Sequence, residues 1–314
     1  MKTVTLLIPC FNEEQSLPLL WEKLVQLMDS SPLYQWQILF INDGSRDNTL
    51  PVIKQLAARD SRVAFVSLSR NFGKENAMLA GFDYASGDCM VIMDADLQHP
   101  PHLVLEMLKY WEEGYQDVYA RRNSRETDSW LRRKLSTAYY RLLQKASRTE
   151  VLQNVGDFRL LDRKCIDALK SMRETERYTK GMYCWIGFKK KEIEFEPAER
   201  VAGKSTFNYG RLVGLAIEGF TSYTTAPLRI STITGIIVSL MSFILLLFYL
   251  VKAIIWGDTV QGFPTLITVI LFLGGVQLLS LGIIGEYLGR VFNETKKRPV
   301  YIVDDSNIEL SCKE

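Results

Sequence analysis

The sequence predicts an α/β domain with a mainly parallel sheet, followed by two C-terminal transmembrane helices. Short apolar and β-branched runs alternate with helical patterns up to about residue 120, which is typical of a parallel sheet covered on both faces. Residues 230–251 and 263–284 are two runs of 22 residues without a charged side chain. As a helix, each run would span about 33 Å, enough to cross the hydrocarbon core of a membrane, which is about 30 Å thick.

The charges around the two apolar runs predict their orientation. Arg229 precedes the first run, and four basic residues follow the second: Arg290, Lys296, Lys297 and Arg298. The link between the runs carries only Lys252 and Asp258 as charged residues. The positive-inside rule therefore places both flanks in the cytoplasm, as in a multi-pass membrane protein. The alternative, two buried helices of a soluble core, fits the glycine-containing link less well.

Composition excludes several classes of protein. The chain has 47% hydrophobic residues and a formal net charge of +2. It therefore lacks the strong positive charge that would indicate nucleic-acid binding. Its five cysteines are scattered without a C-x-x-C pair, which suits a reducing compartment and argues against a zinc site. The first residues, "MKTVTLLIPCFNEE", do not predict a signal peptide. His99 and His102 flank two prolines and are interpreted as loop residues rather than as a metal pair.

Five strands and four helices are expected in the soluble part. The expected strands cover residues 4–8, 37–41, 63–68, 89–93 and 117–120. The expected helices cover residues 13–28, 47–59, 74–85 and 100–114, with Gly87 as the C-cap glycine of the third. Asp47 or Asn48 is expected to cap the second helix.

Polar clusters follow the expected strands where each strand ends. They are Asn12-Glu13, Asp43-Gly44-Ser45, Asn71 with Lys74, Asp94-Ala95-Asp96 and Arg121-Arg122. In open α/β sheets, ligands bind beyond the carboxyl ends of the strands, so these clusters predict a binding site. The alternative is that they are turn residues and helix caps.

Asp94 and Asp96 stand one residue apart after a buried strand. Two carboxylates this close raise each other's pKa unless a cation lies between them. Hard oxygen ligands favour Mg²⁺ or Mn²⁺, which usually bind substrate phosphates as well. The pair therefore predicts a metal–phosphate site.

Four motifs resemble those of one enzyme family: "IPCFNEE", "INDGSRDNT", "NFGKENAMLAGFDYASGD" and "MDADLQHPP". They look like the motif series of inverting family 2 glycosyltransferases with the GT-A (Rossmann-like) fold. More narrowly, they resemble the polyprenyl-phosphate glycosyltransferases, that is, bactoprenol glucosyltransferases and dolichol-phosphate mannose synthases. The resemblance extends to about Tyr209, and the two C-terminal runs fit the bactoprenol branch. This branch implies a multi-pass protein of the bacterial inner (plasma) membrane.

The resemblance implies a role for each cluster on the donor side. Residues that would bind the nucleotide sugar are Pro9, Asn12, Glu13, Asp43, Lys74 and Gln98, with Asp43 at the base. Asp94, Asp96 and Gln98 would hold Mg²⁺ or Mn²⁺ on the donor diphosphate. Asp157, expected on a loop, would face the reaction centre and orient the sugar or the acceptor; a role as base is possible but chemically unnecessary. UDP-glucose is the expected donor, with UDP-N-acetylglucosamine and GDP-mannose as alternatives.

The acceptor implied by the resemblance is a lipid phosphate. A phosphate monoester has a second pKa near 6, so it is mostly ionised at neutral pH and needs no general base. It does need Arg and Lys around it, and residues 121–148 contain nine of them against two acids. Apolar residues interleave at helical spacing, which predicts a basic helix over residues 128–147 on an anionic membrane surface; the alternative is a solvated helix.

The resemblance also assigns the acceptor phosphate to particular residues: Arg121, Arg133, Arg200, Lys204 and Ser205. Arg122 and Arg132 could exchange places with the first two, and the last three would lie on a mobile loop. The expected organisation is a catalytic domain over residues 1–226 with a second interfacial helix at 207–225. A transmembrane region follows over 227–290 with spans at 230–252 and 263–285, and then a cytoplasmic tail at 291–314.

The resemblance implies that a metal-dependent enzyme transfers a sugar, with inversion, to undecaprenyl phosphate, and that it forms a homo-oligomer such as a tetramer. One alternative is a membrane glycosyltransferase with a carbohydrate acceptor. A processive polysaccharide synthase would carry a Q-x-x-R-W motif, and this sequence has none. The remaining alternative is a non-catalytic membrane-anchored protein that binds nucleotide sugars.

Overall fold

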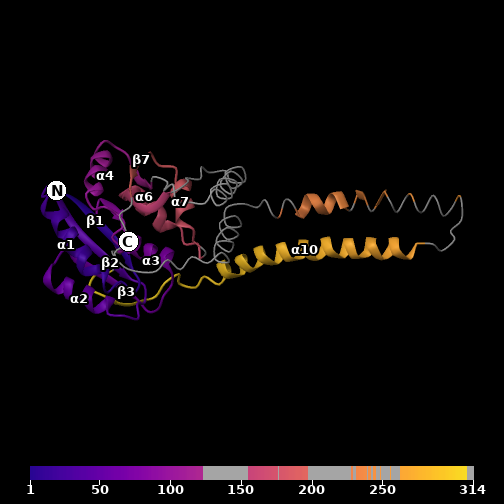
Figure 1. Cartoon of the computed structure of the whole chain (residues 1–314), viewed down its shortest axis with the longest axis horizontal. Coiled ribbons are helices and arrows are strands. Elements are labelled where there is room, and N and C mark those ends of the chain that lie inside the picture. The colour runs from indigo at the N-terminus through magenta and orange to yellow at the C-terminus, as the bar shows by residue number, and fades with distance from the viewer. Residues whose placement is uncertain are drawn as a thin grey trace. The chain divides into compact units, whose positions relative to one another are not determined.

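The computed structural model describes residues 1–122, 155–175, 177–196 and 262–309, together with a few helical residues between 228 and 255. The chain divides into two compact units. The described part of the first unit comprises residues up to 196 and from 298 onward, and that of the second lies within 210–297. Figure 1 labels the helices and strands and colours them by their position along the chain.

A mixed sheet forms the centre of the first unit. Among the described residues it has eight strands in the order β7-β5-β6-β4-β1-β2-β3-β8. Their bounds are β1 (Lys2–Cys10), β2 (Tyr34–Asn42), β3 (Val63–Leu68), β4 (Cys89–Ile92), β5 (Asp117–Arg122), β6 (Val155–Asp162), β7 (Lys190–Phe195) and β8 (Val303–Ser306). Strands β1 to β4 pair in parallel, as β5 does with β7, which confirms the prediction of a mainly parallel sheet. The sequence did not predict β6, β7 and β8, and of these three β6 and β8 run antiparallel to their neighbours.

Helices cover both faces of this sheet. One buried cluster contains residues of α1 (Ser16–Asp29), α2 (Thr49–Arg59) and α4 (Leu103–Glu112). The other contains residues of α3 (Lys74–Tyr84), α6 (Arg163–Ser171) and α7 (Thr179–Trp185). Successive side chains of β1 point to opposite faces of the sheet, so Leu6 and Ile8 pack in the first cluster and Leu7 packs in the second.

Gly87 does not cap α3, contrary to the sequence prediction. The helix ends at Ala85 in an extended conformation. A Cβ atom at Gly87 would lie 2.6 Å from the side-chain oxygen of Thr5, so the glycine permits close approach to β1.

The residues after the second apolar run return to the sheet. They were predicted as a tail, but β8 adds to the edge of β3, and Asn307 donates to the carbonyl of Val63 and accepts from the amide of Phe65. The hydroxyl of Tyr301 donates to buried Asp83 over 2.5 Å. This segment therefore belongs to the folded first unit.

In the second unit, helix α10 (Phe263–Thr295) is 33 residues long and continues ten residues beyond the predicted span at 263–285. Within the described part of the chain, one helical stretch, Phe272–Thr295, is long and apolar enough to cross a membrane. Its large apolar side chains are exposed, as Leu278 is at 71%. Most of the first predicted span lies outside the described residues, so the structure does not confirm two spans.

Candidate functional site

The chain after β4 places three polar side chains on one side of the loop. Asp94, Asp96 and Gln98 are partly exposed, whereas each residue between them is buried. Leu97 reaches this arrangement with a φ of +64°, which is uncommon for a branched side chain. The amide of Gln98 donates to Asp96 Oδ1 over 3.1 Å. The three predicted metal ligands therefore share a side of one short loop, which we call the ligand loop (residues 94–99).

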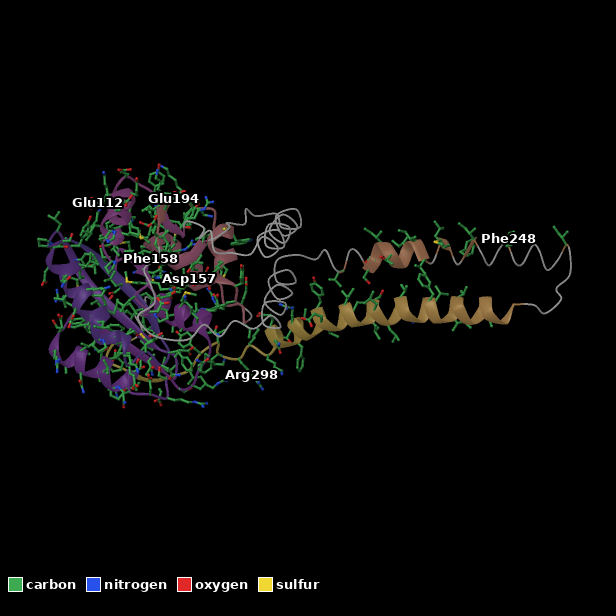
Figure 2. The ribbon with its side chains drawn as sticks, in the orientation of Figure 1. Glu112, Asp157, Phe158, Glu194, Phe248 and Arg298 are labelled. Atoms are coloured by element: carbon green, nitrogen blue, oxygen red, sulfur yellow. The ribbon has the colours of Figure 1, made fainter. Side chains whose placement is uncertain are left out.

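Asp157 lies beside this loop, on strand β6 and not on the loop predicted from the sequence. It reaches the site because β6 inserts antiparallel next to β4. Its side chain is 9% exposed, and Figure 2 labels it next to Phe158. Lys74, the first residue of α3, joins it to the ligand loop: Nζ lies 2.6 Å from Asp94 Oδ1 and 2.8 Å from Asp157 Oδ2. The other oxygen of Asp157, Oδ1, is buried and has no hydrogen-bond partner among the residues that the structure describes.

These contacts shift the pKa values of the ion pairs. Burial lowers the pKa of Lys74, but attraction by Asp94 and Asp157 outweighs it and leaves the pKa above its usual range. Burial raises the pKa of Asp157, but Lys74 and Lys180 outweigh it and leave the pKa below its usual value. Asp157 is therefore ionised at neutral pH and is a weak base, which agrees with an orienting role.

Lys74→Met is expected to reverse the contribution of Asp157 to stability. In the wild type this carboxylate stabilises the fold above its unfolded pKa, near 3.8, and the contribution is lost as the pH falls through the lowered folded pKa. Without Lys74, burial and repulsion by Asp94 outweigh the remaining attraction by Lys180 and raise the pKa, so that ionisation destabilises the fold. Because Lys74 is 41% exposed, the effect at pH 7 is about 1 kcal/mol, or a fall of about 2–4 °C in Tm. Melting curves between pH 3 and pH 7 check it, and a wild-type pH profile in the variant would contradict it.

Glu13 adds a third carboxylate near Asp94 and Asp96. Its pKa is raised by burial and further by repulsion from Asp96 and Asp94. Pro9, at the end of β1, is partly exposed, as is Glu13. A cation among these carboxylates would relieve the repulsion.

The loops after β1 and β2 are tied together. Asn12 adopts a φ of +57°; its amide donates to the Ser45 hydroxyl over 3.0 Å, and its Oδ1 accepts from the amide of Arg46 over 2.9 Å. Gly44 has a φ of +60°, and a Cβ atom there would lie 2.2 Å from the carbonyl carbon of Arg70. The tight contact between the loops that follow β2 and β3 therefore requires glycine at position 44.

Asp43, predicted to bind the base of the nucleotide, has a structural role here. It is 3% exposed, and its carboxylate accepts from the amides of Phe72 (2.7 Å) and Gly73 (2.9 Å). Burial raises its pKa in spite of these two bonds. The contacts fix the segment that leads into α3 and so position Lys74.

The described residues contain no group of three or more His, Cys, Asp or Glu side chains that could hold a metal ion. Two carboxylates and an amide on one side of a loop still fit Mg²⁺ or Mn²⁺, because these ions commonly take one or two carboxylates and complete their coordination with water and substrate phosphates.

Comparison with known proteins identifies the family. The model of glycosyl transferase family 2 matches residues 5–169, more than half of the chain. The chain belongs to glycosyl transferase family 2. The GtrB C-terminal hairpin model matches residues 226–291, so the glycosyltransferase also carries this hairpin after its catalytic domain.

Two curated relatives extend over nearly the whole glycosyltransferase. CsbB of Bacillus subtilis (strain 168) is 46% identical over 97% of this chain and 92% of its own length. A prophage bactoprenol glucosyl transferase homolog of Escherichia coli (strain K12) is 42% identical over 96% of this chain and 98% of its own. Among solved structures, glucosyl-3-phosphoglycerate synthase from Mycobacterium tuberculosis, in complex with Mn²⁺ and UDP-glucose, is 17% identical, with a TM-score of 0.43 over 68% of this chain and 76% of that one.

Most residues predicted for the acceptor lie outside the described part of the glycosyltransferase. These are Arg133, Arg200, Lys204 and Ser205, together with both predicted interfacial helices. Arg121 is described, at the end of β5, where its guanidinium lies 3.1 Å from Glu192 Oε1. Only the backbone of Arg122 is described.

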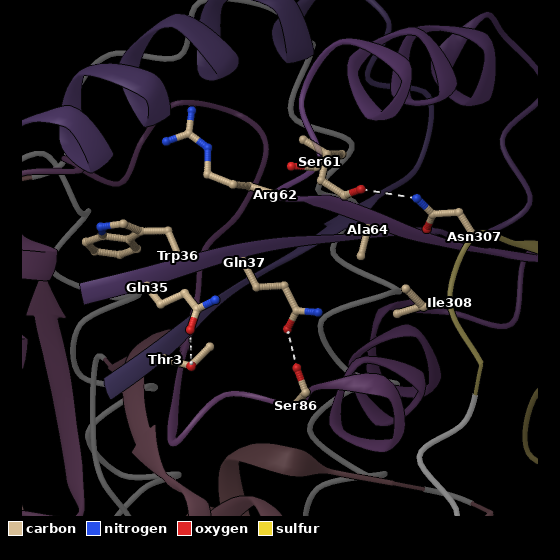
Figure 3. A pocket seen from close by; sticks show the side chains of 11 residues that line it. Thr3, Gln35, Trp36, Gln37, Ser61, Arg62, Ala64, Ser86, Asn307 and Ile308 are labelled. Atoms are coloured by element: carbon tan, nitrogen blue, oxygen red, sulfur yellow. Dashed lines mark hydrogen bonds between the residues drawn. The ribbon is translucent and has the colours of Figure 1, made fainter. Parts of the chain in front are cut away.

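A pocket of about 400 Å³ lies elsewhere in the glycosyltransferase (Figure 3). Its lining includes Thr3, Gln35 and Val63 from the amino ends of β1, β2 and β3, and Asn307 from the returning C-terminal segment. The ligand loop follows the carboxyl end of β4, so this pocket is not the candidate site.

The sequence did not predict two features of the site. It named Lys74 and Asp157 separately but not the bridge that joins Asp94, Lys74 and Asp157. It placed His99 correctly in a loop but missed that this residue is buried, at 2% exposure. The alternation of polar and apolar residues from 94 to 98, continued one step, would have predicted that His99 points inward.

Proposed function

We propose that this protein transfers glucose from a nucleotide sugar to polyprenyl phosphate at the cytoplasmic face of the membrane, with inversion. The observation that carries the proposal is likeness over nearly the full length, hairpin included, to relatives named bactoprenol glucosyl transferase. A carbohydrate acceptor or a non-catalytic binding role would leave this full-length likeness unexplained.

On the donor side, Asp94, Asp96 and Gln98 would hold Mg²⁺ or Mn²⁺ against the diphosphate of the nucleotide sugar. The metal would supply a Lewis acid that neutralises charge on the leaving diphosphate. Lys74 lies between Asp94 and Asp157, so its positive charge would stabilise both carboxylates. Its ammonium group would also contact the donor. Pro9, Asn12 and Glu13 would line the nucleotide pocket, and Asp43 would hold the base. The bonds that Asp43 accepts from the amides of Phe72 and Gly73 fix the segment before Lys74.

On the acceptor side, the phosphate is itself the nucleophile and is mostly ionised at neutral pH. Asp157 need not remove a proton, and its lowered pKa suits a carboxylate that orients the sugar or the acceptor. Arg121, Arg133, Arg200, Lys204 and Ser205 would bind the acceptor phosphate. Arg121 would have to share or leave Glu192 to do so.

The two apolar runs would span the membrane over about 230–252 and 263–285, with helices at 128–147 and 207–225 on its surface. Both the catalytic domain (1–226) and the residues after the spans (291–314) would be cytoplasmic, and β8 supports this because it joins the two within one sheet. A homo-oligomer such as a tetramer is part of the proposal.

The experiment that tests the function is a transfer assay on the purified full-length protein in detergent. It contains undecaprenyl phosphate, Mg²⁺ or Mn²⁺, and radiolabelled UDP-glucose, UDP-N-acetylglucosamine or GDP-mannose. We expect labelled lipid with UDP-glucose, lost on addition of EDTA and restored by excess metal. Label in the lipid with another donor would correct the sugar, and absence of labelled lipid with every donor would overturn the lipid acceptor.

A further inference from the structure

His99, the last residue of the ligand loop, is a buried histidine whose ring points away from the exposed side of the loop. Its side chain is 1% exposed, although the neighbouring Gln98 and Pro100 are partly exposed. The family function proposed above uses the outward residues of this loop and leaves the histidine without a role. A polar ring this deeply buried needs hydrogen-bonding partners to offset its loss of hydration.

The ring accepts a hydrogen bond from the backbone of a proposed metal ligand. The amide of Asp94 donates to His99 Nδ1 over 3.1 Å, so Nδ1 carries no proton and the neutral ring has its proton on Nε2. Nε2 in turn lies 4.0 Å from Asp94 Oδ2. One side chain thus closes the loop across five residues and fixes the direction of the Asp94 peptide.

The same ring packs against the strand that carries Asp157. It stacks on Phe158, with ring centroids 4.6 Å apart and planes 10° from parallel. Phe195, at the end of β7, packs on it edge-on at 6.1 Å. Because Phe158 directly follows Asp157, the imidazole connects the backbone of Asp94 to the backbone beside Asp157.

Together these contacts set the distance between two carboxylates. Lys74 joins their side chains on the exposed side, and His99 joins their backbones on the buried side. We propose that His99 is a positioning residue that holds Asp94 in place for the metal and keeps the ligand loop in register with Asp157. This inference rests on the proposed function, because it assumes that Asp94 is a metal ligand.

Two substitutions separate the hydrogen bond from the packing. His99→Phe keeps an aromatic ring against Phe158 and Phe195 but removes the acceptor. His99→Asn places an oxygen the same number of bonds from Cα as Nδ1, so it keeps an acceptor and loses the ring. Phe195→Leu is the matched control, since it removes an aromatic contact from the same cluster and leaves the hydrogen bond intact.

The first measurement uses the metal-free full-length protein. Hydrogen exchange of the Asp94 amide is expected to be about tenfold faster in His99→Phe than in the wild type, because the amide loses its acceptor. In His99→Asn and Phe195→Leu the exchange rate should stay close to that of the wild type. Equal protection in His99→Phe and the wild type would overturn the inference without involving the metal.

The second measurement is binding of Mn²⁺ in the presence of UDP, followed by the electron paramagnetic resonance signal of free Mn²⁺. We expect His99→Phe to weaken binding about 10- to 100-fold, the usual effect of removing a partner that orients a ligand, while Phe195→Leu binds as the wild type does. Wild-type affinity in His99→Phe would overturn the inference. If the wild type and Asp96→Asn both fail to bind Mn²⁺, the proposed metal site is wrong, and the inference falls with it.

Discussion

Asp96→Asn is expected to lower the rate of sugar transfer by about 1,000-fold or more. Asp96 shares the exposed side of the ligand loop with Asp94 and Gln98, and its proposed role is to hold the metal that neutralises the leaving diphosphate. A Lewis acid at that position contributes several kcal/mol to the transition state, and about 1.4 kcal/mol corresponds to a tenfold change in rate. The assay is transfer of label from UDP-glucose to undecaprenyl phosphate at saturating Mg²⁺ and Mn²⁺.

The substitution should leave the fold intact, because the side chain is partly exposed and asparagine has the same shape. Asp167→Asn is a matched control: Asp167 is a 61% exposed carboxylate on α6 that pairs with Arg163 at helical spacing. It should retain transfer close to that of the wild type. Retained transfer in a folded Asp96→Asn protein would remove this residue from the metal site.

The parallel core of the sheet could be predicted because its signals are local. Residues 63–68 match β3 at both ends, and α3 begins at Lys74 as expected. Each element has its own apolar run and its own breaker, and the strand–helix alternation then dictates parallel pairing. The ligand loop was found for the same reason, since two carboxylates after a buried strand need no distant partner to be noticed.

Strand β6 could not be placed in the same way. Its sequence, "VGDFRLLD", contains polar residues that look like a loop until Arg159 and Asp157 acquire partners from other strands. Arg159 pairs with Asp117 on β5 and Asp157 with Lys74 on α3, across 42 and 83 residues of sequence. Strand β8, "VDDS", has no apolar pattern at all and forms because the β3 edge is available. Both depend on contacts that only the folded chain provides.

The candidate site is therefore assembled from one predictable part and one that depends on tertiary structure. The ligand loop follows from local sequence, whereas the position of Asp157 depends on the insertion of β6 between β4 and β5. Lys74 reaches both because Asp43 holds the two amides just before it. Changes that loosen β6 should consequently affect the site even when they lie outside it.

The strongest such change is expected at Asp117. Its carboxylate and the guanidinium of Arg159 are almost fully buried, and Arg159 Nη1 lies 3.1 Å from Asp117 Oδ2. Arg159 also lies over the ring of Tyr183, at 3.6 Å, and stands two residues from Asp157. Asp117→Asn leaves this guanidinium buried without its counterion, which typically lowers the free energy of unfolding by about 3–5 kcal/mol. Thermal and urea unfolding of the detergent-solubilised protein would measure the loss.

Two further variants distinguish the buried charge from a general effect of substitution. Asp167→Asn removes one partner of an exposed pair and should change the free energy of unfolding by less than about 1 kcal/mol. The double variant Asp117→Asn, Arg159→Met should recover much of the stability that the single variant loses, because no uncompensated charge remains inside. If Asp117→Asn were as stable as the wild type, the pair would not be what holds β6 in the sheet. The position of Asp157 would then depend on the ladders with β4 and β5 alone.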